Sequence, residues 1–280
     1  MLRLGRHRHH WLLLAASLLQ ACSRTPDPAL SPAAFEYEKA APSAAACPSP
    51  AAADPGTDQQ TPGGVRFVVR APSNYRADIA HPLLVVYAPA GHSPQANERF
   101  TRFTRDATAR GWLVAYAGAR PMALPTMKAM AEVPVAVQAG WCVDASRIYA
   151  TGHSDGGTIT TALAVLPELP RAFAGIAPSA AGFRGEDLKA YACPAPTPVL
   201  ILHNREDAHF PGYGLEAARW WAACNRCEPT PQGGPDGCDQ YRDCAAGGAV
   251  RYCEPPGGHA QWPDRQRDIV DFLAQWQRRP

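Results

Sequence analysis

A strand, a tight turn and a helix start follow one another in Ile148-Tyr149-Ala150-Thr151-Gly152-His153-Ser154-Asp155-Gly156-Gly157. A Gly-x-Ser-x-Gly pattern alone arises by chance in about one chain in ten of this length. A place between a strand and a helix, however, is what a nucleophile elbow requires. The turn is so tight that the neighbours of the serine lack side chains, which accounts for Gly152 and Gly156. The sequence therefore predicts Ser154 as an exposed nucleophile, with a purely structural turn as the alternative.

The segments on both sides of this turn alternate between strand and helix patterns. Runs rich in Val, Ile and Tyr, several of them continuous as in parallel strands covered on both faces, predict strands. These runs are Val65–Val69, Leu83–Tyr87, Trp112–Tyr116, Ile148–Thr151, Phe173–Pro178, Val199–His203 and, more weakly, Val250–Cys253. Helical patterns lie at Asn97–Arg110, Thr158–Leu166, Gly214–Cys224 and Asp264–Arg278. This order predicts an α/β protein with a doubly wound, mostly parallel sheet, in which ligands bind at the carboxyl ends of the strands.

Two further residues complete a candidate catalytic triad. A serine hydroxyl is a poor nucleophile and needs a base, which a carboxylate orients. In hydrolases of this architecture the order along the chain is Ser, acid, His. Asp207 and His259 each follow a predicted strand, so the predicted triad is Ser154, Asp207 and His259. The competitors are Glu206 for the acid, and His203 and His209 for the base.

The developing oxyanion needs two backbone N–H donors. One is expected from Asp155, directly after the nucleophile, and the other from the loop after the Leu83–Tyr87 strand. This loop reads Ala88-Pro89-Ala90-Gly91-His92. Because Pro89 has no N–H, Ala90 is the expected second donor, with Gly91 as the alternative.

Four segments together resemble the polyhydroxybutyrate depolymerase and feruloyl esterase group of α/β-hydrolases. They are Ile148–Gly157, Phe173–Pro178, Pro198–Pro211 and Gly257–Pro263, and the resemblance extends over roughly residues 65–280. It supports the same three triad residues and implies an α/β-hydrolase without a large cap domain. It also implies hydrolysis of carboxylic esters by a serine esterase. We expect no cofactor and no metal, and polyhydroxyalkanoate or aromatic, feruloyl-type esters as the substrates, with short acyl esters and lipids as the alternatives. The alternatives are a serine peptidase of the same fold and a non-catalytic surface binding protein on a hydrolase fold.

The chain departs from this group at two places. The group has His-Gly where this chain has Ala88-Pro89, and Gln261 widens the usual spacing between the histidine and Trp262. Trp262 is expected to bind substrate, because it follows the loop that carries the catalytic histidine.

The first 21 residues have the layout of a bacterial lipoprotein signal peptide. A basic segment is followed by the apolar run Trp11–Leu19, which is too short to cross a hydrocarbon core of about 30 Å. The sequence Leu19-Gln20-Ala21-Cys22 resembles a lipobox and predicts lipidation of Cys22. Ordinary secretion with Cys22 unmodified is the alternative. We therefore expect an exported lipoprotein of the outer membrane, the cell surface or the periplasm.

The next stretch, residues 22–64, is expected to be a tether. Residues 23–64 contain eight prolines and eleven alanines, and such a composition buries too little surface to fold by itself. The catalytic domain is then expected to span residues 65–280. Without the three arginines of residues 1–21 the chain has 24 basic and 25 acidic residues. This balance predicts no nucleic-acid partner, so the expected partners are an ester substrate, possibly polymeric, and the membrane through the lipid alone.

Eight cysteines remain besides Cys22, and an even number in an exported protein predicts disulfides. The candidates are Cys142, Cys193, Cys224, Cys227, Cys238, Cys244 and Cys253, with Cys47 in the tether the least certain. A Cys142–Cys193 bridge is expected. The alternative is a zinc site on Cys224, Cys227, Cys238 and Cys244, although their spacing fits such a site poorly. Bridges are expected to staple the polar insert Glu228–Gly248, which would form one wall of the substrate cleft.

Overall fold

The computed structural model describes residues 27–37, 47, 55–234 and 236–278. The expected signal peptide and Cys22 lie outside the described residues. In chain order the elements are η1 (Pro28–Leu30), β1 (Gln59–Gln60), β2 (Arg66–Arg70), β3 (His81–Tyr87), α1 (Pro94–Thr101), α2 (Thr104–Thr108), β4 (Leu113–Ala117), α3 (Leu124–Gly140), β5 (Val143–His153), α4 (Asp155–Val165), β6 (Gly175–Ser179), α5 (Gly185–Lys189), β7 (Pro198–Leu202), α6 (Tyr213–Cys224), β8 (Gln232–Gly233), β9 (Cys238–Tyr241), β10 (Ala249–Cys253) and α7 (Gln266–Leu273).

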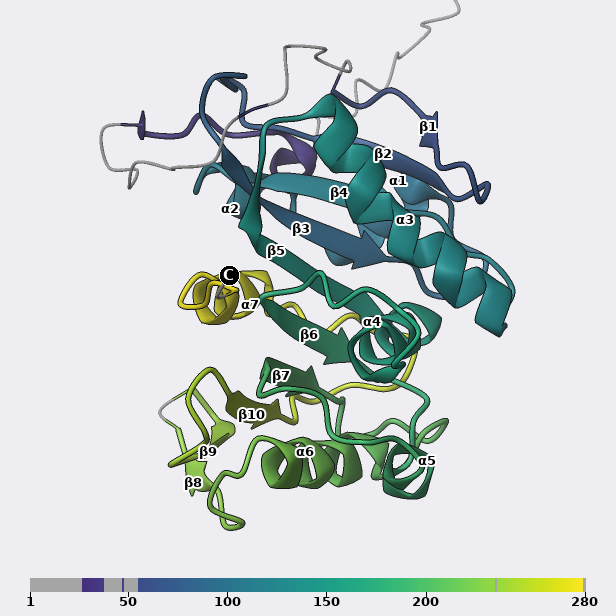
Figure 1. Cartoon of the computed structure of the whole chain (residues 1–280), viewed down its shortest axis with the longest axis vertical. Coiled ribbons are helices and arrows are strands. Elements are labelled where there is room, and N and C mark those ends of the chain that lie inside the picture. Colours follow the sequence, from purple (N-terminus) through teal and green to yellow (C-terminus); the bar gives the residue numbers. More distant parts are fainter. Residues whose placement is uncertain (1–26, 38–46, 48–54, 235, 279–280) are drawn as a thin grey trace, which may run out of the picture.

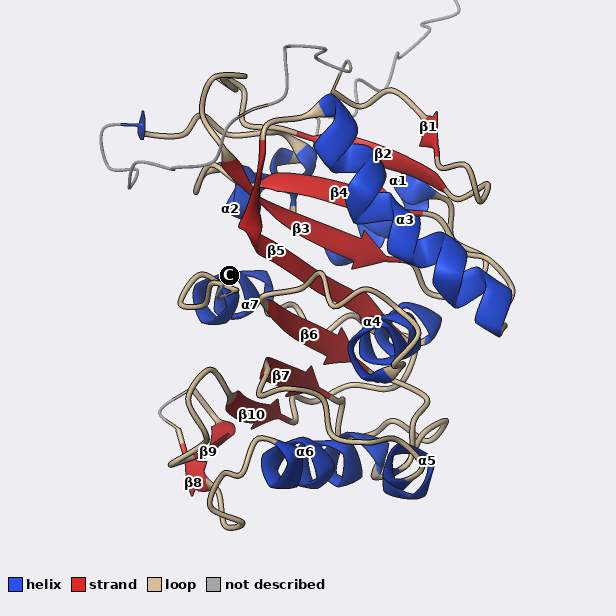
Figure 2. Cartoon of the chain, in the orientation of Figure 1, coloured by secondary structure: helices blue, strands red, loops and turns tan. Residues whose placement is uncertain are grey.

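The described strands form one sheet in the order β1-β2-β4-β3-β5-β6-β7-β10-β9-β8 (Figures 1 and 2). The six central strands, from β4 through β3, β5, β6 and β7 to β10, run parallel. The outer strands β1, β2, β9 and β8 are antiparallel to their neighbours. All seven expected strands are present, which confirms the doubly wound, mostly parallel sheet. Between β6 and β7 the chain forms only the short helix α5, so no large cap domain interrupts this connection.

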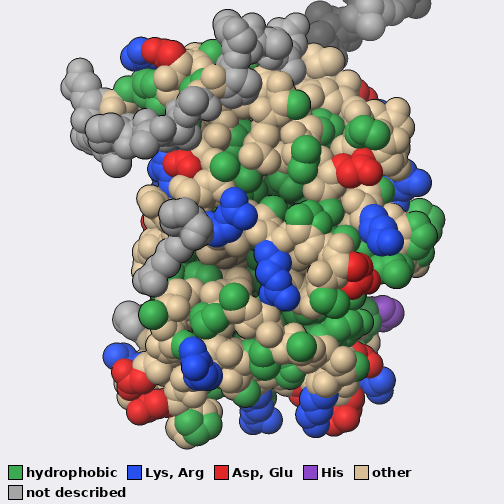
Figure 3. Space-filling model, viewed as in Figure 1, with side chains coloured by type: hydrophobic (Ala, Val, Ile, Leu, Met, Phe, Trp, Pro, Cys, Tyr) green, Lys and Arg blue, Asp and Glu red, His purple; other side chains and the backbone are tan. Residues whose placement is uncertain are grey.

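Helices cover both faces of the sheet. Helices α3, α4 and α6 lie on one face, and α1, α2 and α7 lie on the other (Figure 1). In β3, Leu83 and Val85 contribute to one core cluster and Leu84 and Val86 to the other, and all four are fully buried. Burial on both faces explains why this strand is a continuous apolar run. On the outer surface of the first face, positive and negative side chains are interspersed among hydrophobic ones (Figure 3).

Two helical regions differ from the expectation. The pattern at residues 97–110 forms two helices, because Arg102 adopts a left-handed conformation with φ 56° and ends α1. Ser93 begins α1, since its Oγ accepts a hydrogen bond from the Ala96 N–H at 3.2 Å. The long helix α3 has no counterpart among the expected helices. It carries Pro125 in its first turn, where proline is tolerated, and Pro134 in its interior, where proline disfavours a helix.

Parts of the expected tether pack on the domain. The Ala33 N–H donates to Thr108 Oγ1 at 2.8 Å. Phe35 and Asn74 exchange two hydrogen bonds, at 2.9 and 2.8 Å. Strand β1 pairs with β2. The sheet therefore begins before the expected boundary at residue 65, and the segment 27–37 lies against the folded domain.

Four disulfides join all eight cysteines of the described residues. They are Cys47–Cys142, Cys193–Cys224, Cys227–Cys244 and Cys238–Cys253. The pairing confirms that these cysteines form disulfides. Such a set fits an exported protein, and no helix in the described ranges is long and apolar enough to span a bilayer.

The expected Cys142–Cys193 bridge is wrong, because Cys142 pairs with Cys47 and Cys193 pairs with Cys224. Cys142 and Cys193 precede β5 and β7, and β6 lies between these strands. Two strand spacings are about 10 Å, which exceeds the reach of a disulfide. The zinc alternative fails because all four of its thiols are in disulfides. Disulfides hold the insert, residues 228–248, as expected. Its strands β8 and β9 extend the sheet edge beyond β10, and no residue of the insert lines the pocket that contains Ala90 and Asp155. A place of the insert in the wall of the substrate cleft stays a prediction.

Candidate active site

Ser154 occupies a strained turn between β5 and α4, with φ 55° and ψ −117°. A Cβ on Gly156 would lie 2.0 Å from the carbonyl oxygen of Tyr87, and one on Gly152 would lie 2.6 Å from it. Only glycine fits at these two positions. The Ser154 N–H donates to the carbonyl oxygen of Ser179 at 3.0 Å, which fastens the turn to β6. The geometry is that of a nucleophile elbow.

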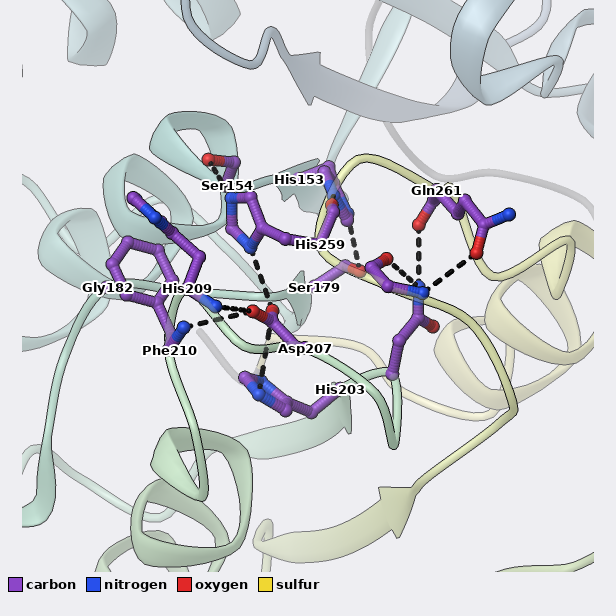
Figure 4. Close-up of polar contacts among 12 residues, drawn as sticks. His153, Ser154, Ser179, Gly182, His203, Asp207, His209, Phe210, His259 and Gln261 are labelled. Carbon is purple, nitrogen blue, oxygen red and sulfur yellow. Dashed lines mark hydrogen bonds and ion pairs between the residues drawn. The ribbon is translucent and has the colours of Figure 1, made fainter.

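A continuous chain of hydrogen bonds runs from the serine to a buried carboxylate (Figure 4). Ser154 Oγ lies 2.8 Å from His259 Nε2, and His259 Nδ1 lies 2.8 Å from Asp207 Oδ2. Because an ionised carboxylate can only accept, we assign the imidazole proton to Nδ1. Nε2 is then free to accept the serine proton. The structure thus brings together all three residues of the predicted triad.

Asp207 is held in one orientation and kept ionised. Its side chain has 0% exposure. Its Oδ1 accepts hydrogen bonds from the N–H groups of His209 and Phe210, both at 2.9 Å. Burial alone would raise the pKa of this carboxyl, but the hydrogen bonds from His259 and the Phe210 N–H outweigh it and hold the pKa below its usual value. A fixed negative charge therefore faces the imidazole.

The loops that carry the acid and the base are joined to each other. We call residues 203–212, after β7, the acid loop, and residues 254–263, after β10, the histidine loop. Backbone bonds between them run from Arg205 N to Pro255 O at 2.9 Å and from Glu206 N to Gly257 O at 3.0 Å. The buried side chain of Asn204 donates to the carbonyl oxygens of Gly258 and Gln261, at 2.9 and 2.7 Å. These contacts fix the position of the base relative to the acid.

The three competitors for the acid and base roles lie around the triad. Glu206 is exposed, and its carboxylate accepts a backbone N–H of the histidine loop. His209 is exposed, with its ring centroid 4.7 Å from that of His259. His203 is buried behind the acid, 3.6 Å from its carboxylate, and burial lowers its pKa. Among the described residues, none of the three forms a hydrogen bond to Ser154.

His153 ties the histidine loop to the nucleophile elbow, and the sequence analysis assigned it no role. Its Nε2 lies 2.6 Å from the carbonyl oxygen of His259, so Nε2 carries the proton. Its Nδ1 then accepts from the Ser179 hydroxyl at 2.9 Å. Burial lowers the pKa of His153 to about 4. The signal that could have identified it is its place directly before Ser154.

Trp262 is mostly buried and lines a surface pocket together with Phe100 and residues of the histidine loop. It is 7% exposed, and its ring contacts Phe100, Phe103 and His153 at centroid distances of 6.3, 5.5 and 6.0 Å. Trp262 does not line the pocket that contains Ala90 and Asp155, and its role in binding substrate stays a prediction. The histidine loop turns inward at this residue, which packs behind His153 and against α1.

The two expected oxyanion donors line one pocket of about 540 Å³. Asp155 is the first residue of α4, so its N–H has no partner within the helix. The N–H of Ala90 likewise has no hydrogen bond within the described part of the chain. Gly91 follows with φ 74°, which turns the loop back from the nucleophile. Two unpaired N–H groups beside a nucleophile can stabilise an oxyanion.

Aromatic side chains lie on the opposite side of the serine. The Phe210 ring is 4.9 Å from the ring of His259 and perpendicular to it. Phe210 also stacks on Tyr213 at 5.2 Å. A Cβ on Gly182 would lie 3.0 Å from the Phe210 ring, which brings the loop after β6 against this wall.

One group of metal-ligand side chains occurs among the described residues, namely Asp236, Cys238 and Cys253. The two cysteines are bonded to each other. The group therefore offers no thiolate, and a single carboxylate does not make a metal site.

The chain is similar in sequence to feruloyl esterase B of Piromyces equi, with 29% identity over 246 residues. The match covers 75% of this chain and 45% of the esterase, so the chain spans less than half the length of this relative. No family model matches the chain.

Solved structures of esterases resemble the model. Acetyl xylan esterase from Aspergillus awamori aligns with a TM-score of 0.62 and 14% identity, covering 78% of this chain and 99% of that one. A thermostable esterase aligns with a TM-score of 0.57 and 18% identity, and the alignment covers 79% of this chain and 62% of that one. S-formylglutathione hydrolase from Staphylococcus aureus aligns with a TM-score of 0.55 and 14% identity, and the alignment covers 78% of this chain and 97% of that one. At these identities the likeness establishes the fold.

Proposed function

We propose that this chain, an α/β-hydrolase of the esterase type, hydrolyses carboxylic esters through an acyl-enzyme on Ser154. The observation that carries the proposal is the hydrogen-bond chain from Ser154 through His259 to Asp207, with both links at 2.8 Å. The unpaired N–H groups of Ala90 and Asp155 on one pocket support it. The similarity to feruloyl esterase B favours an ester over an amide as the substrate.

The reaction follows from these positions. Ser154 Oγ attacks the ester carbonyl carbon while its proton passes to His259 Nε2. Asp207 keeps the other proton on Nδ1 and stabilises the imidazolium. The carbonyl oxygen becomes an oxyanion and accepts hydrogen bonds from the Ala90 and Asp155 N–H groups. His259 then protonates the alcohol oxygen as the ester C–O bond breaks, and water hydrolyses the acyl-enzyme by the same steps.

The proposal also includes the cellular location of the protein. We infer export and anchoring to a membrane through a lipid on Cys22, so that the protein contacts the bilayer through that lipid alone. The sequence Leu19-Gln20-Ala21-Cys22 supports this, and so do the four disulfides. Polyhydroxyalkanoates and feruloyl-type esters are the substrate classes that the resemblance implies, and the substrate screen compares them with esters of short acyl groups.

A fluorophosphonate reaction followed by mass spectrometry tests the proposal. Protein purified from the producing cells with its disulfides intact should carry the adduct on Ser154. The adduct should disappear in His259→Ala and persist in Ser73→Ala, which changes an exposed serine outside the site. The same digest gives the mass of the N-terminal peptide, which reveals whether Cys22 carries a lipid.

Other results would point to the alternative functions. Folded protein without an adduct would favour the non-catalytic binding protein. An adduct combined with faster cleavage of an amide than of the ester with the same acyl group would favour the peptidase.

A further inference from the structure

We infer that the pocket beside Ala90 and Asp155 is an acyl-binding site for short acyl groups that carry a carboxylate, which Arg120 binds. The inference rests on the proposed esterase function and adds its substrate class. Its starting point is a pocket of about 540 Å³ that contains both oxyanion donors.

The position of the pocket assigns it to the acyl group. His259 must protonate the leaving alcohol, so the alcohol lies on the side of the histidine loop. No residue of the histidine loop or of the acid loop lines the pocket. With the carbonyl oxygen on the Ala90 and Asp155 N–H groups, the acyl chain is the substituent that remains to enter it.

The lining of the pocket favours a small acyl group without a large ring. Its walls are glycine, alanine, proline, serine, arginine, histidine and aspartate residues, with no Phe, Tyr, Trp, Leu, Ile or Val among them. A feruloyl ring would find no benzene or indole ring to pack against there. The aromatic pair Phe210 and Tyr213 lies instead beside His259, on the alcohol side.

Arg120 supplies a half-buried positive charge to the pocket. Its Nη1 donates to the carbonyl oxygen of Gly63 at 2.7 Å. A guanidinium has five N–H donors, and the other four have no acceptor within the described ranges, nor does a carboxylate there pair with Arg120. The second guanidinium of the pocket, Arg66, already pairs with Asp58. Arg120 is thus the cation left for a ligand, and guanidinium groups bind carboxylates with two parallel hydrogen bonds.

Asp155 sets where the ligand carboxylate can lie. Its own carboxylate lines the same pocket next to Ser154 and forms no ion pair with Arg120. A ligand anion close to the ester carbonyl would be repelled by it. The anion must therefore lie away from the nucleophile, toward Arg120. Half-esters of short dicarboxylic acids, such as succinate, carry their carboxylate at the far end of the acyl chain from the ester carbonyl and are therefore the substrates to test.

Three ethyl esters test the inference on the disulfide-bonded protein: monoethyl succinate, ethyl butyrate and ethyl ferulate. The first two differ chiefly in a carboxylate against a methyl group, and acid release is followed by chromatography. We expect kcat/KM for monoethyl succinate to exceed that for ethyl butyrate by about tenfold or more. Ethyl ferulate should be the poorest of the three.

Variants connect that preference to Arg120. Arg120→Gln should reduce the preference for monoethyl succinate about tenfold and change kcat/KM for ethyl butyrate less than twofold. Arg120→Lys should keep part of the preference, because the charge remains. Arg76→Gln is the matched control, since it removes an arginine that pairs with Asp78 outside the pocket, and it should leave the preference unchanged.

The outcomes separate this inference from the esterase proposal. Equal rates for monoethyl succinate and ethyl butyrate in the wild type would overturn it, as would a preference that survives Arg120→Gln. Fluorophosphonate labelling of Ser154 without turnover of any of the three esters would overturn it too and leave the esterase proposal standing. Failure of both labelling and turnover on folded protein would overturn the proposed function itself.

Discussion

The two sides of Ser154 are built in opposite ways. On the side of His259, backbone bonds join the acid loop to the histidine loop, and Asn204 and His153 add side-chain bonds to the same loop. On the other side, the N–H groups of Ala90 and Asp155 have no partner among the described residues. The base, His259, must keep one orientation through the reaction, and hydrogen bonds fix the loop that carries it. The oxyanion exists only briefly, and its donors must be unpaired before substrate arrives.

The largest expected effect on kcat comes from a comparison of two neighbouring carboxylates, Glu206 and Asp207. Asp207→Asn should lower kcat about 10⁴-fold, because the amide cannot hold the imidazole in the required tautomer. Glu206→Gln should change kcat only a few-fold, since its exposed side chain bonds the loop and not the ring. Steady-state kinetics on an activated ester measures both. Similar losses in the two variants would mean that loop geometry, and not the charge at Asp207, governs the base.

A proline at position 90 tests the side of Ser154 that carries the oxyanion donors. Ala90→Pro removes the N–H donor and should lower kcat about 10²–10³-fold. Ala90→Gly keeps the donor and serves as the control, with an expected loss well below that. Circular dichroism and the melting temperature show whether each variant is folded. If the proline variant retained full kcat, the second donor would have to come from Gly91.

The smallest of the three effects is the response of folding to pH. The pKa of His153 is about 4 in the folded protein and about 6.5 when exposed in the unfolded chain. The unfolded state therefore binds the proton more tightly. Stability is fully present above pH 6.5 and is lost as pH falls toward 4, by up to about 3 kcal/mol.

Urea unfolding at several pH values measures this loss. In His153→Gln, the amide can donate to the histidine loop and accept from Ser179 without titrating, so the decline between pH 6.5 and 4 should become shallower. The control is His209→Gln, which replaces an exposed histidine. An unchanged slope in His153→Gln would assign the decline to other groups, such as His81 and His203, whose pKa values burial also lowers.

The central strands and the triad could be predicted from the sequence because each has a strong local signal. β3 is buried on both faces, which requires a continuous apolar run, and Gly152 and Gly156 are dictated by the contact with Tyr87. Ser154, Asp207 and His259 follow strand ends in the order that this architecture imposes. These features depend on a few neighbouring residues and on the rule that parallel strands end at one edge.

The features that escaped prediction depend on contacts between distant residues. Trp262 looked exposed in the sequence, but packing against Phe100 and Phe103 buries it. Strands β1 and β8 have two residues each and carry no apolar pattern. Helix α3 contains Pro134 in its interior, which argues against a helix, yet its buried residues hold it on the sheet. The segment 27–37 gains its order only by lying on a finished domain.

The disulfide pattern has a consequence for how the cysteines are paired during oxidation. The bonds Cys47–Cys142 and Cys193–Cys224 each join cysteines that are consecutive in the sequence once Cys22 is set aside. An oxidant that pairs thiols as they emerge makes both bonds correctly. The bonds Cys227–Cys244 and Cys238–Cys253 interleave, so pairing in order of emergence joins the wrong partners there. The need for disulfide isomerisation is thereby confined to the last four cysteines, at the sheet edge beyond β10 and away from Ser154.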